Sequence, residues 1–179
     1  ASCAVIRIAA RALFGLRVVR RAGPELAENY IYAANHRSNA DPPIVGSTLG
    51  REVHFMAKSS LFQTRVLGSV IRYFNAIPTR RESFDREAFG KATELLSRGE
   101  SLLIFPEGTR SRGAGFGEAK PGVGYLALTT KVPVLPVYAR GTGSLKDAFR
   151  RREPLAVVPQ SDLAAGPAHD AGHSSVSDH

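Results

Sequence analysis

The sequence is poor in cysteine, tryptophan and long apolar runs. Cys3 is the only cysteine among 179 residues, and tryptophan is absent. A single thiol excludes an internal disulfide framework and a cysteine-based zinc site, and it favours a reducing compartment. No run of 18 uncharged apolar residues occurs, and Arg7 and Arg11 interrupt the only segment that suits a signal sequence. We therefore expect no membrane-spanning helix, so that any membrane contact is peripheral.

Acidic residues are scarce relative to basic ones. Lys and Arg number 24 against 16 Asp and Glu, which gives a net charge of +8 and a pI near 10.1. A basic protein favours an anionic partner, and phospholipid, nucleotide and nucleic acid all qualify. The basic side chains do not alternate with aromatic ones as a stacking surface for bases requires, so we expect no nucleic-acid partner.

The first 21 residues contain five arginines and no acid. From Val5 to Leu16, apolar residues recur at steps of three and four, which predicts one apolar face of a helix. A basic amphipathic helix of this kind suits the headgroup region of an anionic membrane. A helix that docks on the protein core with a solvated basic edge explains the pattern equally well. Residues 1–16 are therefore predicted to form a membrane-surface or docking helix.

Further along, short apolar segments alternate with stretches of helical periodicity. This alternation predicts an α/β fold with a central, largely parallel, mixed sheet flanked by helices. In such folds, functional sites gather where the strands end. The predicted strands cover residues 16–20, 30–34, 53–57, 76–79, 101–105 and 134–138. The predicted helices cover residues 41–49, 61–73, 84–97 and 123–131.

One domain and a tail account for the whole chain. A chain of 179 residues suits a single hydrophobic core, and we place the domain at residues 1–152. Residues 153–179 contain four acids, no Lys or Arg and many small polar residues, which predicts a disordered tail. His169 and His173 have a spacing that suits a metal on a helix, but the composition of the tail disfavours one. We assign no metal.

Residues 35–41 place an imidazole and a carboxylate five positions apart, across a predicted strand-to-helix turn. If Asp41 bonds one ring nitrogen of His36, it fixes the tautomer and leaves the other nitrogen free to accept a proton. An imidazole has an ordinary pKa of about 6.5, which suits a general base near neutral pH. Two prolines follow Asp41, and capping of a helix start explains this aspartate as well. The spacing alone leaves both roles open.

Four short blocks resemble, in order, those of the glycerolipid acyltransferases typified by 1-acylglycerol-3-phosphate acyltransferase. Residues 35–41 resemble the Asn-His-x4-Asp catalytic block, and residues 76–81 resemble the second block, which closes with Arg81. Residues 105–111, Phe-Pro-Glu-Gly-Thr-Arg-Ser, match the third block without a mismatch, and residues 132–137 are similar to the fourth. The likeness spans residues 5–145 and implies a glycerol-3-phosphate acyltransferase-like fold.

The resemblance implies an O-acyltransferase of phospholipid biosynthesis that needs no cofactor and no metal. Such an enzyme moves a fatty acyl group from acyl-CoA or acyl carrier protein to the free hydroxyl of 1-acylglycerol 3-phosphate, giving phosphatidic acid. By this resemblance His36 is the general base and Asp41 orients it. The implied substrate-binding residues are Arg81, Glu107, Gly108, Thr109 and Arg110. The expected partners are these lipid and thioester substrates, acyl carrier protein and the cytoplasmic face of a membrane, contacted peripherally.

Several alternatives stay open from the sequence. The four blocks do not separate 1-acylglycerol 3-phosphate from glycerol 3-phosphate, another lysophospholipid or a lyso-ornithine lipid as the acceptor. A noncatalytic protein that binds a lipid surface is the alternative from a different class.

No Gly-x-Ser-x-Gly nucleophile motif occurs, so we expect direct transfer without an acyl-enzyme. After the fourth block the family continues through a strand and a helix, whereas this chain has Arg150, Arg151, Arg152 and then the tail, which predicts a shortened sheet edge.

Overall fold

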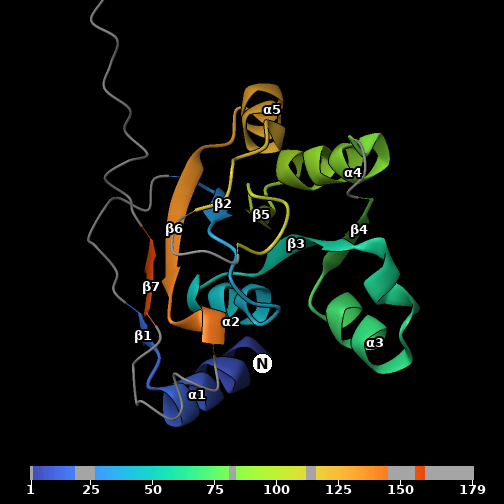
Figure 1. The fold of residues 1–179 in the computed structure, drawn as a ribbon. Helices are drawn as coiled ribbons and strands as arrows, with labels where there is room; N and C mark the ends of the chain where they lie inside the picture. The colour runs from blue at the N-terminus through green and yellow to red at the C-terminus, as the bar shows by residue number, and fades with distance from the viewer. Residues whose placement is uncertain (1, 19–26, 81–83, 112–115, 145–155, 160–179) are drawn as a thin grey trace, which may run out of the picture.

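The structure is a computed structural model that describes residues 2–18, 27–80, 84–111, 116–144 and 156–159. Within these ranges, one sheet of seven strands has helices on both faces (Figure 1). The strands are β1 (Arg17–Val18), β2 (Ile31–Ala34), β3 (Val53–Lys58), β4 (Ala76–Thr79), β5 (Ser101–Ile104), β6 (Val134–Arg140) and β7 (Ala156–Pro159). The α-helices are α1 (Ser2–Phe14), α2 (Asp41–Thr48), α3 (Arg65–Tyr73), α4 (Arg86–Ser97) and α5 (Gly122–Thr130).

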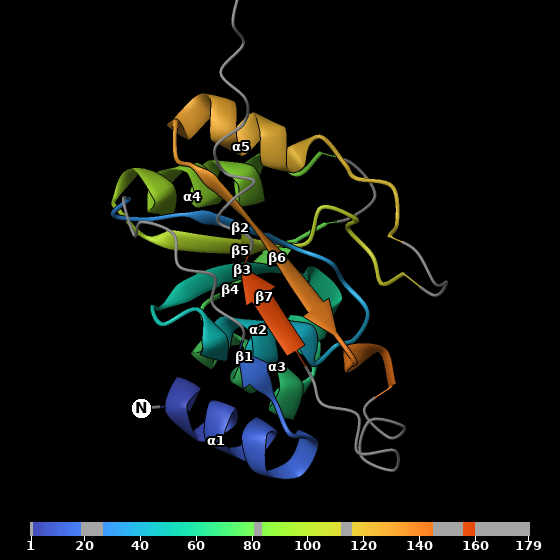
Figure 2. The same cartoon turned by 90° about the vertical axis from the view of Figure 1, so that its left-hand side faces the viewer.

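The sheet has the strand order β1-β7-β6-β2-β5-β3-β4. Strands β6 and β7 pair antiparallel, and the other neighbouring strands pair parallel, which confirms the predicted mixed, largely parallel sheet. Strand β2 lies between β6 and β5, with Tyr32 opposite Leu135 on one side and Leu103 on the other. Because parallel strands end at one edge, the loops that follow β2 and β5 leave the sheet together (Figure 2).

Two apolar clusters fill the spaces between the sheet and its helices. Side chains alternate along β2, so that Ile31 packs in the cluster beneath α4 and α5, whereas Tyr32 and Ala34 pack on the opposite side with α1, α2 and α3. Strand β5 is buried along its whole length, as its apolar run predicts. Each buried Leu or Ile contributes about 1.5–3 kcal/mol of transfer free energy, so β2 and β5 form a rigid centre for the sheet.

Helix α1 confirms the predicted N-terminal helix, but it packs through an unexpected face. Ala10 is buried against the core, and α1 lies alongside α2. Val5, Ile8 and Leu13 of the predicted apolar face are 65%, 65% and 57% exposed. Within the described part of the chain, the apolar face of α1 is therefore uncovered.

The helix predicted for residues 61–73 is wrong in its first turn. Residues Ser59–Gln63 form a 3-10 helix, Thr64 is extended, and α3 begins only at Arg65. Gly68 explains this arrangement, because a Cβ at this position would lie 2.5 Å from the carbonyl oxygen of Phe62. The missing side chain lets α3 fold back onto the 3-10 turn, a tertiary contact that helical periodicity does not indicate.

The disordered tail predicted for residues 153–179 is wrong for Ala156–Pro159. These residues form β7, which pairs antiparallel with β6 and parallel with β1. Val157 is fully buried, so a short apolar segment overrides the polar composition around it. Strand β7 extends the sheet past the predicted domain boundary at residue 152 and covers the edge of β6, so the expected shortening of that edge is also wrong. His169 and His173 lie outside the described residues.

Candidate active site

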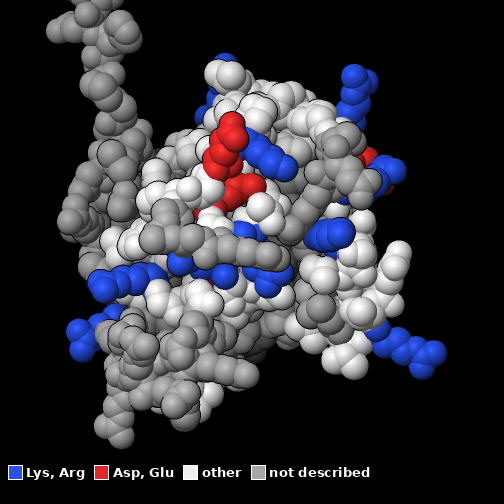
Figure 3. All heavy atoms as spheres, viewed as in Figure 1, with Lys and Arg blue, Asp and Glu red and all other residues white. Residues whose placement is uncertain are grey.

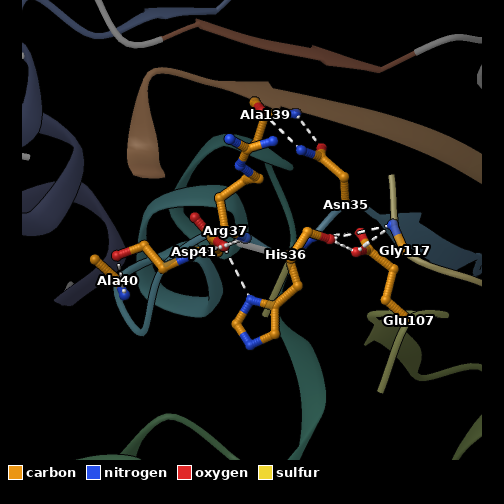
Figure 4. A network of polar contacts seen from close by, with 10 residues as sticks. Asn35, His36, Arg37, Ala40, Asp41, Glu107, Gly117 and Ala139 are labelled. Carbon is orange, nitrogen blue, oxygen red and sulfur yellow. Dashed lines mark hydrogen bonds and ion pairs between the residues drawn. The ribbon is translucent and has the colours of Figure 1, made fainter. Parts of the chain in front are cut away.

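The loop of residues 35–40 carries His36 from the end of β2 to the start of α2. Nδ1 of His36 lies 2.9 Å from Oδ2 of Asp41 (Figure 4). The same Oδ2 accepts hydrogen bonds from the N–H groups of Arg37 at 2.6 Å and Ser38 at 2.7 Å. Asp41 is completely buried, and His36 is buried beside it. Three donors thus fix the carboxylate, and the imidazole and carboxylate that the spacing brings together do meet.

Asp41 does not cap helix α2, so the capping interpretation is wrong. The N-cap residue is Ala40, which makes no side-chain cap bond, and Asp41 is the first residue inside the helix. Its carboxylate turns back to bond the loop that precedes it. A negative charge in the first turn of a helix is also stabilised by the helix dipole.

The imidazole of His36 is held by a second side chain. The ring of Phe105 stacks on it, with ring centroids 4.3 Å apart and planes inclined by 27°. Because Nδ1 faces the carboxylate of Asp41, the bond favours the tautomer that carries its proton on Nδ1. Nε2 then keeps its lone pair and is able to accept a proton from a hydroxyl.

Two residues of the third block (residues 105–111) hydrogen-bond the backbone N–H and C=O of His36. Oε1 of Glu107 accepts a hydrogen bond from the N–H of His36 at 3.0 Å, and the N–H of Ser111 donates to the C=O of His36 at 2.8 Å. Oε2 of Glu107 accepts from the N–H of Gly117 at 2.9 Å (Figure 4). It also accepts from the hydroxyl of Ser111. Glu107 itself is buried. Its carboxylate therefore ties the loop after β5 to the loop after β2.

Asn35 has a structural role that its sequence context does not indicate, because its side chain connects the end of β2 to β6. Its side-chain Nδ2 donates to the C=O of Ala139 at 2.9 Å, and its Oδ1 accepts from the N–H of the same residue at 2.7 Å. This pair joins the start of the His36 loop to β6 (Figure 4). A polar amide that ends an apolar strand, next to a histidine, is the sequence signal for such a role.

A cavity of about 340 Å³ opens beside His36. Strands β3, β4 and β5 and helices α4 and α5 all contribute side chains to its wall. Gly122 permits close packing there, because a Cβ on it would lie 2.7 Å from the ring of Phe89. The apolar wall is formed by Met56, Phe84, Phe89, Ile104, Phe105 and Val123.

The substrate-binding residues implied by the resemblance occupy different places around this cavity. Gly108 lines it and has a φ of +65°, a left-handed conformation that favours glycine. Thr109 and Arg110 are exposed on the loop that follows. Glu107 is buried, and its carboxylate accepts a hydrogen bond from the backbone N–H of His36. Arg81 lies outside the described residues.

Two cations border the cavity without having been assigned from the sequence. Lys120 lies so close to Gly108 that a Cβ on the glycine would meet its Nζ at 3.1 Å. No acid within the described ranges forms an ion pair with Lys120. Arg80 also lines the cavity, but its side chain is held 3.7 Å from Asp85 and 3.6 Å from Glu87.

A family model described as Acyltransferase matches residues 15–140, which is more than half of the chain. The match includes the His36–Asp41 pair, the third block and the cavity between them. The chain therefore belongs to this acyltransferase family.

Particular relatives share the sequence and the fold. The 1-acyl-sn-glycerol-3-phosphate acyltransferase of Bacillus subtilis is 28% identical over 156 residues, which cover 87% of this chain and 77% of the relative. The chloroplastic enzyme BAT2 of Brassica napus, with the same activity in its name, is 32% identical over 117 residues. That match covers 64% of this chain, which spans 34% of the length of the plant relative.

A solved structure supports the same relationship. The crystal structure of the 1-acyl-sn-glycerophosphate acyltransferase PlsC from Thermotoga maritima superposes with a TM-score of 0.64 at 26% sequence identity. The superposition covers 97% of this chain and 72% of the other. The predicted fold class is thus confirmed by a relative as well as by the strand order.

Proposed function

We propose that this chain is an O-acyltransferase that moves a fatty acyl group from acyl-CoA or acyl carrier protein to the free hydroxyl of 1-acylglycerol 3-phosphate, giving phosphatidic acid. The observation that carries the proposal is the bonded pair of His36 and Asp41 at one end of an apolar cavity. Membership of the acyltransferase family and the names of bacterial and plant relatives support the choice of acceptor.

In the proposed reaction, Nε2 of His36 takes the proton of the acceptor hydroxyl while the hydroxyl oxygen attacks the carbonyl carbon of the thioester. Asp41 stabilises the imidazolium that forms. The tetrahedral intermediate then collapses, the carbon–sulfur bond breaks, and the imidazolium returns its proton to the departing thiolate. A thiol has an ordinary pKa of about 8.5, so this leaving group needs little assistance. The products are an ester and a free thiol, with no acyl-enzyme between them.

The cavity beside His36 supports the binding of an acyl chain. Its volume of about 340 Å³ falls in the usual range for small-molecule sites, and apolar side chains form most of its wall. In this proposal the thioester lies near His36, at the end of the cavity where Gly108 lets the backbone approach it closely.

Basic side chains support the binding of an acceptor that carries a phosphate. Figure 3 shows Lys and Arg side chains gathered across the middle of the face seen in Figure 1, which is the face onto which the loops after β2 and β5 project. We propose that Arg81 and Arg110 bind the phosphate through their guanidinium forks. Thr109 and Gly108 complete the proposed acceptor site between them.

We also propose that the protein attaches peripherally to the cytoplasmic face of a membrane. No helix in the described residues is long and apolar enough to cross a bilayer. The exposed Val5, Ile8 and Leu13 of α1, together with Arg7 and Arg11, support contact with an anionic lipid surface. In this arrangement the lipid acceptor comes from the membrane, and the thioester donor comes from solution on acyl-CoA or acyl carrier protein.

The direct test is an assay that supplies both donors with either 1-acylglycerol 3-phosphate or glycerol 3-phosphate and identifies the product. We expect phosphatidic acid from 1-acylglycerol 3-phosphate. His36→Ala should lower kcat by about 10²-fold or more, because general-base catalysis contributes that much. Binding of the variant to lipid vesicles should be unchanged, since His36 does not contact the lipid surface in this proposal.

His54→Ala is the matched control for this variant. His54 pairs with Glu100 at the amino ends of β3 and β5, away from the cavity, so its removal should leave kcat unchanged. Lipid binding without any acyl transfer by the wild-type chain would instead support the noncatalytic alternative. A product formed from glycerol 3-phosphate would move the proposal to that acceptor.

A further inference from the structure

We propose that Glu107 is a positioning residue, whose carboxylate fixes the backbone of His36 for catalysis and does not bind the phosphorylated acceptor. This inference rests on the proposed function in one respect, namely that His36 is the general base. It changes the role that the resemblance implies for Glu107, from a ligand of the acceptor to a support of the catalytic loop.

The carboxylate of Glu107 is already occupied by groups of the protein. Oε1 accepts the N–H of His36, and Oε2 accepts the N–H of Gly117 and the hydroxyl of Ser111. A carboxylate offers about four acceptor positions, so three of them are taken. Glu107 is only 7% exposed, and these hydrogen bonds reduce the free-energy cost of burying its charge. An acceptor phosphate, which is itself an anion, has no attraction to this group.

The position of Glu107 relative to the cavity agrees with this role. Pro106 and Gly108 on either side of it line the cavity that contains His36, whereas Glu107 does not. Glu107 instead lines a separate hollow of about 270 Å³, together with residues 116, 117 and 119 and with strands β2 and β6. Figure 4 shows the carboxylate directed at the backbone of His36, on the side away from the imidazole.

The backbone of His36 determines where Nε2 lies. The ring is anchored at Nδ1 by Asp41 and stacked on Phe105, so the remaining freedom of Nε2 is a movement of the loop itself. Glu107 and Ser111 bond the N–H and the C=O of His36 and thereby suppress that movement. A displacement of a catalytic group by about 1 Å can cost about 100-fold in rate. Glu107 can therefore control kcat without touching either substrate.

Gly117 offers an independent way to disturb the same carboxylate. A Cβ on Gly117 would lie 2.7 Å from Oε2 of Glu107, which is too close for the carboxylate to stay in place. The φ of Gly117 is not in the left-handed region, so alanine is compatible with the backbone there. Gly117→Ala thus displaces the carboxylate of Glu107 and leaves its charge intact.

The experiment compares Glu107→Gln and Gly117→Ala with two matched controls in steady-state kinetics. Glutamine keeps the length of the side chain, but its NH₂ group opposes the donors that the carboxylate accepts. Both variants should lower kcat by about 10- to 100-fold and leave KM for donor and acceptor unchanged. Glu118→Gln removes an exposed charge on the same loop, and Gly90→Ala adds a methyl group to open space on α4. Both controls should retain the kcat of the wild-type chain.

A rise in KM for 1-acylglycerol 3-phosphate with an unchanged kcat in Glu107→Gln would overturn the proposal and make Glu107 an acceptor ligand. A second measurement needs no substrate. Amide hydrogen exchange of His36, followed by NMR, should be faster in Glu107→Ala than in Glu118→Ala, because only the former removes the acceptor of that N–H. Equal exchange rates overturn the positioning role. If the wild-type chain transfers no acyl group, the proposed function fails, and the exchange comparison still decides the role of Glu107.

Discussion

At the scale of single residues, the carboxylate of Asp41 organises the proposed catalytic loop. One of its oxygens accepts from the imidazole of His36 and from two backbone N–H groups. The other oxygen is buried and accepts no hydrogen bond from the described residues. A buried anion that is only partly hydrogen-bonded stabilises a positive charge beside it. In the proposed reaction, the imidazolium that forms on His36 is such a charge.

Replacing Asp41 by asparagine tests this role. The amide keeps the size of the side chain and an oxygen that can accept the three bonds made to Oδ2, but it removes the negative charge. We expect kcat to fall by about 10²- to 10⁴-fold, with a melting temperature close to that of the wild-type chain. Steady-state kinetics and thermal unfolding measure the two effects. A variant that keeps the wild-type kcat would show that Asp41 has only a structural role.

The spacing of residues in the sequence predicted the contact between His36 and Asp41, but it could not have predicted the contact between His36 and Glu107. His36 and Asp41 are five positions apart, so a single turn brings them together. The bond from His36 to Glu107 joins residues 71 positions apart and requires β2 and β5 to be neighbours. The order of strands in a sheet is a property of the whole fold, so the spacing of the blocks does not reveal this contact.

At the scale of secondary structure, Asp85 connects the rim of the cavity to the start of α4. It is the N-cap residue of α4 and accepts from the N–H of Ala88 at 3.2 Å and from the N–H of Arg80 at 2.7 Å. The pKa of the Asp85 carboxyl lies below its ordinary value of 3.8, and the hydrogen bond from the backbone N–H of Arg80 is the largest cause. Burial of the carboxyl acts in the opposite direction and raises the pKa.

Asp85→Ala should lower the free energy of unfolding by about 1 kcal/mol at neutral pH, which is typical for the loss of an N-cap. Because the pKa of folded Asp85 is lowered, its bonds stabilise the fold fully above pH 3.8 and progressively less as the pH falls through the folded value. The difference between variant and wild type should therefore shrink in acid. Urea unfolding at several pH values measures it.

Glu87→Ala is the control for this experiment. Glu87 lies in the same first turn of α4, but its side chain is exposed and makes only a distant pair with Arg80. Its removal should change the free energy of unfolding less than removal of Asp85 does. A difference between Asp85→Ala and wild type that stays constant into acid would contradict the lowered pKa.

Element boundaries follow from sequence only where the determinants are local. The start of α2 at Asp41 and the bounds of β4 agree with prediction, because prolines and short apolar runs mark them. The break at Thr64 depends on the close approach of Gly68 to Phe62. Strand β7 is only four residues long, so its apolar pattern is lost in the polar composition around it.

At the scale of the whole molecule, the exposed face of α1 is the feature that a lipid surface would explain. Val5→Asp combined with Ile8→Asp should weaken binding to anionic vesicles by about tenfold or more, because each aliphatic side chain contributes about 1.5–3 kcal/mol when buried. Vesicle co-sedimentation at fixed salt measures the change. Acyl transfer to a soluble, short-chain acceptor should persist, since α1 does not border the cavity.

Leu128→Asp is the matched control for Val5→Asp alone, because each of these two changes adds one negative charge. Leu128 is 73% exposed on α5, on the opposite side of the sheet from α1. The Leu128→Asp variant should bind vesicles as the wild-type chain does if α1 is the contact surface. Equal losses from both changes would mean that the charge of the molecule, rather than the face of α1, determines its binding.

Strand β7 links parts of the molecule that are far apart in sequence. Among the described strands, in the order β1-β7-β6, β1 pairs with the rest of the sheet only through residues Ala156–Pro159. Helix α1 precedes β1 directly, so the tilt of the proposed membrane helix depends on a strand that follows the catalytic blocks. If α1 contacts a bilayer as proposed, truncation or a fusion partner near residue 156 would thus alter how the chain sits on it, even with His36 and Asp41 in place.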